Sequence, residues 1–214
     1  GVDMYANESW KAGMYTSILD IDSNVKGTKT GSDGKGGNID DNAFYVGGYA
    51  TWFSGDGMYV DNVLQYGNHK SRLAATGNNG SYTVRGNTLT ASTEVGKSSR
   101  LGASAWSLEP QAQLIYQYSD FDNSTLDGVT PTKVKMDTAD SFTARLGVRL
   151  VADYDTNHGK FQPYGRVNVW QGLGSKDKTH FSNAVATTTL ESSQQYSSTE
   201  VAAGLSWSID RNLQ

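Results

Sequence analysis

The sequence predicts an all-β fold, an antiparallel transmembrane β-barrel, from three observations: apolar and polar residues alternate, the alternating segments are long, and long connections alternate with shorter ones. The segment 140–153, DSFTARLGVRLVAD, shows the alternation most clearly, because every second residue from Phe142 to Ala152 is apolar. A period of two residues is typical of a strand with two chemically different faces. In a soluble sandwich the apolar face packs on a second sheet, whereas in an outer-membrane barrel it meets lipid and the polar face lines a wet lumen.

Eight segments of this kind follow one another along the chain. They cover residues 10–22, 43–53, 58–69, 83–96, 106–119, 141–153, 161–171 and 197–209. Most are about 11 to 14 residues long, whereas a globular strand has about 5 or 6 residues and a tilted membrane-spanning strand needs about 9 to 11. Their length therefore favours strands that cross a membrane.

The connections between these segments differ in length in a regular way. Long polar connections alternate with shorter ones; the long ones are 24–42, 71–82, 120–140 and 172–196, and the shorter ones 54–57, 97–105 and 154–160. Membrane barrels have long extracellular loops and short periplasmic turns, so this rhythm also predicts a barrel.

The composition excludes several classes of protein. The 214 residues suffice for one large β domain, which we expect to span residues 1–214. No run approaches the roughly 18 apolar residues of a transmembrane helix, so a helical membrane protein is excluded. The formal charge of −4 argues against nucleic acid as a partner, and the absence of Cys removes disulfides and thiolate metal sites.

Alternation sorts most of the polar residues onto one face of the predicted strands. Arg145, Arg149 and Arg166 would form a basic strip there, which glutamates of the same face could neutralise, since charges inside a barrel must be hydrated or paired. We favour a structural network of ion pairs, and a lining that keeps a transported polypeptide from sticking is compatible with it. The residues expected to line the lumen are Lys11, Tyr15, Tyr49, Glu94, Glu109, Gln111, Gln113, Arg145, Arg149, Tyr164, Arg166, Asn168 and Glu200.

Aromatic residues gather toward the two ends of the predicted strands. Amphipathic rings prefer the headgroup level of a membrane, so these positions predict two aromatic girdles. The residues concerned are Trp10, Trp52, Trp106 and Trp207 near the short turns, and Tyr66, Tyr116 and Tyr118 nearer the long loops.

Motifs for catalysis or metal binding are missing from the sequence. The histidines, His69, His158 and His180, lie far apart and have no neighbouring ligand at metal spacing, which favours a solvated surface role for each. The tripeptide GKS at 96–98 imitates the end of a phosphate-binding loop, but Ala91 stands where that loop requires Gly. We therefore predict no catalytic residue, no cofactor and no metal site.

Seven blocks of the sequence, taken together, resemble a known family. In chain order they are FYVGGYATWF (44–53), GMYVDNVLQY (57–66), LTASTEVG (89–96), WSLEPQAQL (106–114), TARLGVR (143–149), FQPYGRVNV (161–169) and EVAAGL (200–205). In this order and spacing they are similar to the translocator β-domain of classical autotransporters, the type Va secretion proteins. The resemblance covers nearly the whole chain outside the long connections.

This resemblance implies a twelve-stranded barrel in the bacterial outer membrane, plugged by a helix that links it to an N-terminal passenger. Such a barrel assists export and surface display of its passenger, as in the adhesin-type autotransporters, and is not itself an enzyme. The partners implied are outer-membrane lipid, the chain's own passenger and linker helix, the barrel assembly machinery and periplasmic chaperones. The long loops would lie on the cell surface.

The two ends of the chain depart from the family pattern. Residues 1–7 resemble the end of an earlier strand and 212–214 the start of a later one, so we expect a domain that lacks its first and last strands. About eight full strands are visible, which leaves open a self-contained eight-stranded outer-membrane barrel with a structural or adhesive role. An outer-membrane enzyme and a soluble lectin-like sandwich are further alternatives, opposed by the scattered histidines and by the strand lengths respectively.

Overall fold

The computed structural model describes residues 1–26, 35–75, 81–126, 131–156, 159–174 and 176–208. The described ranges contain no helix of the length and hydrophobicity needed to cross a membrane. Their strands are β1 (Val2–Ala6), β2 (Trp10–Lys26), β3 (Lys35–Phe53), β4 (Met58–Ala75), β5 (Ser81–Lys97), β6 (Ser99–Arg100), β7 (Trp106–Phe121), β8 (Ser124–Leu126), β9 (Thr132–Met136), β10 (Ala139–Ala152), β11 (Tyr154–Thr156), β12 (Gly159–Gly172), β13 (Lys176–Ser182), β14 (Thr187–Ser193) and β15 (Ser197–Ser208).

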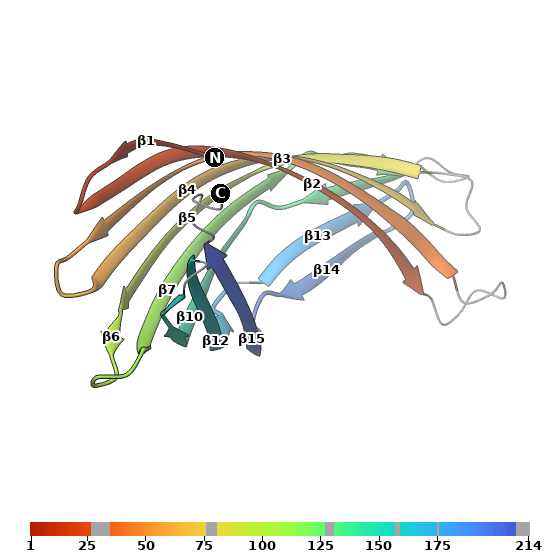
Figure 1. The fold of residues 1–214 in the computed structure, drawn as a ribbon. Coiled ribbons are helices and arrows are strands. Elements are labelled where there is room, and N and C mark those ends of the chain that lie inside the picture. Colours follow the sequence, from red (N-terminus) through yellow and green to blue (C-terminus); the bar gives the residue numbers. More distant parts are fainter. Residues whose placement is uncertain (27–34, 76–80, 127–130, 157–158, 175, 209–214) are drawn as a thin grey trace.

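One large antiparallel sheet holds most of these strands, which confirms the predicted all-β class. Its strands follow chain order, β1-β2-β3-β4-β5-β7-β10-β12, and β15 pairs with β12 at the far end; the short β6 and β11 pair with β7 and β12. Figure 1 shows the sheet curved into a half-barrel, with the red strands β1 and β2 along one side of the curve and the blue β15 at the other. Every neighbouring pair is antiparallel, as hairpin connections require.

Each of the eight predicted strands is present, but several extend further than the alternation indicated. β2 and β3 continue beyond the predicted 10–22 and 43–53, with Asn24 paired to Asn38. Apart from Val25 and Ile39, these extensions consist of glycine and polar residues, so they carry no two-residue pattern. Backbone hydrogen bonds still hold them together, because pairing does not need an apolar face.

A second sheet forms from two connections that the sequence predicted as loops, 120–140 and 172–196. Its four strands are ordered β14-β13-β9-β8, so the two connections are joined to each other through β9 and β13. Val134 of β9 is only 1% exposed, whereas all of β14 is exposed. Short strands rich in Thr, Ser and Lys look like loop sequence, which explains why they were missed.

The outward face of the large sheet carries large, exposed apolar side chains. Leu146 is 68% exposed and Val201 76% exposed, and both lie on the face opposite the arginines of the predicted lumen. The buried apolar residues of the described ranges are few and mostly small: Ala43, Val84, Val134 and Ala152. A water-soluble domain buries its large apolar residues, so this distribution is typical of a sheet that faces lipid.

Aromatic side chains on the inward face lie against glycines of neighbouring strands. Tyr15 stands directly opposite Gly47, and a Cβ built on Gly47 would lie 2.5 Å from Cζ of Tyr15. Each ring thus occupies the space that a side chain on the next strand would need, which fixes the register of the pair. The same arrangement joins Tyr49 to Gly13, Tyr45 to Gly67, Tyr59 to Gly96, Phe121 to Gly86 and Tyr164 to Gly204.

Candidate functional site: the polar inward face

Cross-strand register places the residues predicted to line the lumen on one face of the large sheet. A single row of directly paired residues crosses seven strands: Lys11, Thr51, Asp61, Glu94, Gln113, Arg145 and Trp170. Gln111, Asn168 and Glu200 lie in the next row, and Glu109, Arg149 and Arg166 in the row after it. Tyr15, Tyr49 and Tyr164 have the same parity, so the whole predicted set shares the face.

Arg145 and Glu94 form a buried ion pair near the middle of this face. The Arg145 Nη2 atom lies 2.5 Å from Oε2 of Glu94, and the two side chains are 8% and 17% exposed. The guanidinium also lies over the Trp170 ring, 5.3 Å from its centroid. A charged pair this deep is retained only with good geometry and further hydrogen bonds.

Tyr59 of β4 supplies those further bonds and was absent from the predicted set. Its hydroxyl donates to Oε1 of Glu94 at 2.6 Å and accepts from Nε2 of Gln111 at 3.0 Å. Gln111 also donates to Oε1 of Glu109 at 2.7 Å, so one tyrosine connects two carboxylates on separate strands. The available signal was parity, because Tyr59 lies two residues before Asp61 on the same strand.

A second network surrounds Glu200 of β15. Its carboxylate accepts hydrogen bonds from Nη2 of Arg166 at 2.7 Å, Nδ2 of Asn168 at 3.2 Å and Nε1 of Trp170 at 3.1 Å. Asn168 is fully buried. Three donors from alternate residues of β12 therefore hold a single carboxylate of the neighbouring strand.

The predicted basic strip is only partly neutralised by the glutamates. Arg145 pairs with Glu94 and Arg166 with Glu200, but Arg149 has no ion pair in the part of the chain that the structure describes. Arg149 stacks instead on the Tyr164 ring, with its guanidinium carbon 5.0 Å from the centroid. Glu109 stands opposite Arg149 in the register and is bonded elsewhere.

At the β1–β4 end of the face, tyrosine hydroxyls donate hydrogen bonds to an amide oxygen and to a carboxylate. Tyr15 donates to Oε1 of Gln65 at 2.7 Å, and Tyr49 donates to Asp3 of β1. Lys11 lies over the Phe53 ring at 5.8 Å. These contacts connect β2 and β3 to neighbouring strands. The ion pairs of the inward face, Arg145–Glu94 and Arg166–Glu200, lie on the strands from β5 to β15.

The aromatic residues of the two predicted girdles all point to the outward face in the register. Trp10 pairs with Trp52, and Tyr66 donates to Oδ1 of Asn87 at 2.7 Å. Trp207 pairs with Phe161 on the last two strands. Their depth relative to a membrane surface stays a prediction.

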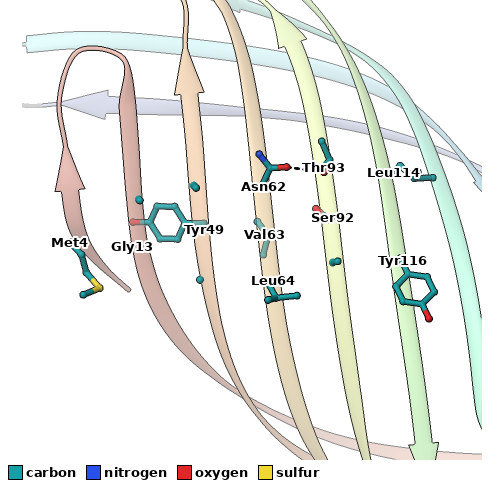
Figure 2. A pocket seen from close by; sticks show the side chains of 14 residues that line it. Met4, Gly13, Tyr49, Asn62, Val63, Leu64, Ser92, Thr93, Leu114 and Tyr116 are labelled. Atoms are coloured by element: carbon teal, nitrogen blue, oxygen red, sulfur yellow. Dashed lines mark hydrogen bonds between the residues drawn. The ribbon is translucent and has the colours of Figure 1, made fainter.

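A shallow groove of about 640 Å³ crosses the outward face over β2, β3, β4 and β5, with β1 and β7 at its two sides. Figure 2 shows it from close by, with Leu64, Leu114 and Tyr116 among its lining residues. Its floor includes one polar contact, a hydrogen bond from Oγ1 of Thr93 to Oδ1 of Asn62 at 2.9 Å. Small side chains such as Ala12 and Ala50 make the groove, because they leave the outward surface low at these positions.

Metal ligands do not gather anywhere in the described ranges, where no group of three or more His, Asp or Glu could hold an ion. His69 is half-buried rather than fully solvated: it packs on Tyr45, with ring centroids 5.4 Å apart, and bonds to Thr88 at 3.1 Å. His180 lies in the second sheet, 3.2 Å from Asp137. His158 lies outside the described residues.

Two carboxylates at the short connections have shifted pKa values. Lys97 lies 2.6 Å from Asp56 and, together with Ser54, lowers the pKa of that carboxyl to about 2. Hydrogen bonds from Gln162 and Lys160 lower the pKa of Asp153. Both groups therefore stay ionised at neutral pH and hold the turns between strands.

The arrangement as a whole defines a class of protein. A curved antiparallel sheet with exposed apolar side chains outside and an ion-paired polar face inside is the design of membrane β-barrels. Comparisons with known proteins narrow this class: residues 1–214 match the model of the Autotransporter beta-domain. The chain belongs to the autotransporter β-domain family, whose members are outer-membrane barrels.

Individual relatives agree with the family assignment. The chain is 31% identical to the pertactin autotransporter of Bordetella bronchiseptica over 148 residues, which is 66% of this chain and 15% of that protein. It is 26% identical to the autotransporter adhesin/invasin TibA of Escherichia coli over 184 residues, 83% of this chain and 17% of that protein. The chain therefore spans less than a fifth of the length of these relatives.

The fold also has a close counterpart among solved structures. The crystal structure of the beta domain of the Bordetella autotransporter BrkA superposes with a TM-score of 0.62, covering 96% of this chain and 86% of that one at 21% identity. At this identity the likeness concerns the fold alone.

Proposed function

We propose that this domain anchors an N-terminal passenger in the bacterial outer membrane and assists its export to the cell surface. The observation that carries the proposal is the separation of the two faces of one sheet. Leu146 and Val201 extend outward into what we infer is lipid, and the ion-paired face turns inward, where a polypeptide in transit would meet hydrated and hydrogen-bonded groups.

The polar inward face suits a lining better than a catalytic centre. Four of its charged groups are engaged in two ion pairs, Arg145 with Glu94 and Arg166 with Glu200, and the histidines of the described ranges lie away from this cluster. We therefore propose that the domain is a transport and anchoring module and not an enzyme. Family membership supports the same interpretation.

The partners we propose follow from this role. They are outer-membrane lipid, the protein's own passenger and linker helix, the barrel assembly machinery and periplasmic chaperones that deliver the unfolded chain. The outward tryptophans and tyrosines would lie at the two membrane surfaces. The second sheet, built from two long connections, would then extend on the cell surface (Figure 1).

Protease treatment of intact cells tests the proposal. Cells producing the full-length protein should lose a surface passenger on treatment, while a β-domain remains protected in the outer-membrane fraction. A control treatment of opened cells should degrade periplasmic markers, which shows that the intact cells were sealed. A single protected species whose mass does not change on treatment would instead indicate a self-contained barrel, and the passenger would be excluded.

A further inference from the structure

Three guanidinium groups surround one small cavity on the inward face. The cavity, of about 300 Å³, is lined by Glu94, Gln111, Arg145, Arg149, Tyr164 and Arg166. The register between β10 and β12 brings two of these guanidinium groups together, because Arg149 of β10 pairs directly with Arg166 of β12.

Several donors around this cavity have no acceptor within the described residues. The Nε atoms of Arg145 and Arg166 are buried and make no hydrogen bond. The Arg149 guanidinium makes a cation–π contact with the Tyr164 ring, and no carboxylate of the described ranges lies within ion-pair distance of it. Buried N–H groups without an acceptor are rare in native proteins, and each requires an explanation.

The nearest carboxylates are already used. Glu94 is bonded by Arg145 and Tyr59, and Glu109 accepts from Gln111 although it stands opposite Arg149. Glu200 is held by three donors of β12. The cavity therefore has one unneutralised guanidinium, that of Arg149. The Nε atoms of Arg145 and Arg166 have almost no accessible surface, so they are not donors to a ligand.

We propose that this cavity, the Arg149 pocket, binds a carboxylate, namely an acidic side chain on the polypeptide segment that occupies the lumen. The proposal rests on the proposed function, which puts such a segment there. A carboxylate matches the pocket in charge, because the one unpaired guanidinium, that of Arg149, balances a single negative charge, whereas Arg145 and Arg166 are already neutralised by Glu94 and Glu200. Its planar pair of oxygens also fits the fork of an arginine.

A tethered carboxylate has an advantage over a free anion. A segment held in the lumen presents its side chain at an effective concentration in the millimolar range or above. A free monocarboxylate such as acetate gains one ion pair with the arginine and has no such effective concentration, so we expect it to bind more weakly.

Photo-crosslinking in cells tests the pocket. Ala202 lies on the inward face directly opposite Arg166, and its neighbour Ala203, on the other face of the strand, is exposed. Each is replaced by p-benzoylphenylalanine in the full-length protein, and crosslinked peptides are identified by mass spectrometry. We expect the probe at 202, but not at 203, to capture a segment of the same polypeptide that contains Asp or Glu.

Substitutions then connect the capture to the arginine. Arg149→Gln should lower the crosslinking yield from 202 about tenfold, the effect of losing roughly one charge-assisted contact. Arg149→Lys should retain more of the yield, and Arg100→Gln, a change at an exposed arginine of β6, should leave it unaltered. Heat-modifiable gel mobility of each variant shows that the barrel has folded.

Other results would overturn the inference. A captured segment without an acidic residue, an unchanged yield in Arg149→Gln, or no capture from 202 would each do so. If instead acetate shifts the Arg149 Nε–H resonance of the purified domain while the crosslink is independent of Arg149, the pocket binds free anions. The protease treatment of cells that carry the unsubstituted protein tests the proposed function independently. The absence of a surface passenger there would contradict the proposed function, whatever the crosslinking result.

Discussion

Glu94 of β5 connects three strands, since Arg145 of β10 and the Tyr59 hydroxyl of β4 both donate hydrogen bonds to it. Removing one partner of a buried pair leaves the other charge without compensation. We expect Glu94→Gln to lower the free energy of unfolding by about 3–5 kcal/mol. Urea unfolding in lipid vesicles measures this change.

An exposed carboxylate provides the control for Glu94. Glu191 of β14 lies 3.5 Å from Lys178, and both side chains are nearly half-exposed. Glu191→Gln should change the unfolding free energy by less than about 1 kcal/mol. Equal effects of the two substitutions would mean that the Glu94 pair is solvated, contrary to its burial.

Asp56 provides a prediction about pH. Its pKa is lowered from 3.8 to about 2 by Lys97 and Ser54. Because the folded-state pKa is below the ordinary value, the contribution of the contact to stability is present above about pH 4 and is lost as the pH falls toward 2. Lys97→Met should return the pKa of Asp56 toward 3.8, as read from a carboxyl NMR titration. An unchanged low pKa would show that Lys97 is not its cause.

At the residue scale, parity predicted which polar residues share a face, but not which atoms bond. The strip formed by Arg145, Arg149 and Arg166 follows from alternation alone. Glu109 bonds to Gln111 and leaves Arg149 unpaired. This choice of partner depends on the register between strands and on the side-chain rotamers. Neither the register nor the rotamers can be predicted from the alternation within one strand.

At the scale of the element, the aromatic–glycine pairs fix how strands lie beside one another. Gly47 faces the Tyr15 ring, and Gly48, its neighbour, points outward with 3.6 Å to the nearest atom. Gly47→Ala should lower the unfolding free energy by about 1–3 kcal/mol, because the new methyl group must displace the ring. Gly48→Ala should be close to neutral, since its methyl enters ordinary contact.

Unfolding of the two glycine variants under the same conditions distinguishes packing from backbone effects. Both substitutions remove the same backbone freedom within one strand. A similar change in both would attribute the effect to the backbone, and the ring contacts would then not determine the register.

The elements themselves were predictable to different degrees. Strands with one apolar face, such as β10, were recognised because lipid and lumen impose opposite demands on alternate residues. The ends of β2 and β3 and the whole second sheet carry no such demand. Their pairing depends on partners far away in the sequence, as with β9 and β13, so local patterns could not show it.

At the scale of the whole molecule, we infer that lipid covers the outward face. Leu146 is 68% exposed near the middle of β10, and Val185, between β13 and β14, is 89% exposed. Leu146→Arg should lower the unfolding free energy in bilayers by about 2–4 kcal/mol, because the charge would enter the hydrocarbon. Val185→Arg should have little effect, since we propose that the second sheet lies outside the lipid. Equal effects would contradict the assignment of the two surfaces.

Spin labelling of β10 decides whether this sheet separates lipid from a wet lumen, and the absence of Cys in this chain allows each label to be placed at a single position. Single cysteines are introduced at each position from 142 to 150 of β10, spin-labelled, and examined in lipid vesicles for accessibility to oxygen and to a water-soluble nickel complex. We predict maxima for oxygen at the even positions and maxima for nickel at the odd ones, in a regular two-residue alternation. Nickel accessibility on both faces, or an inverted alternation, would contradict a sheet that separates lipid from a wet lumen.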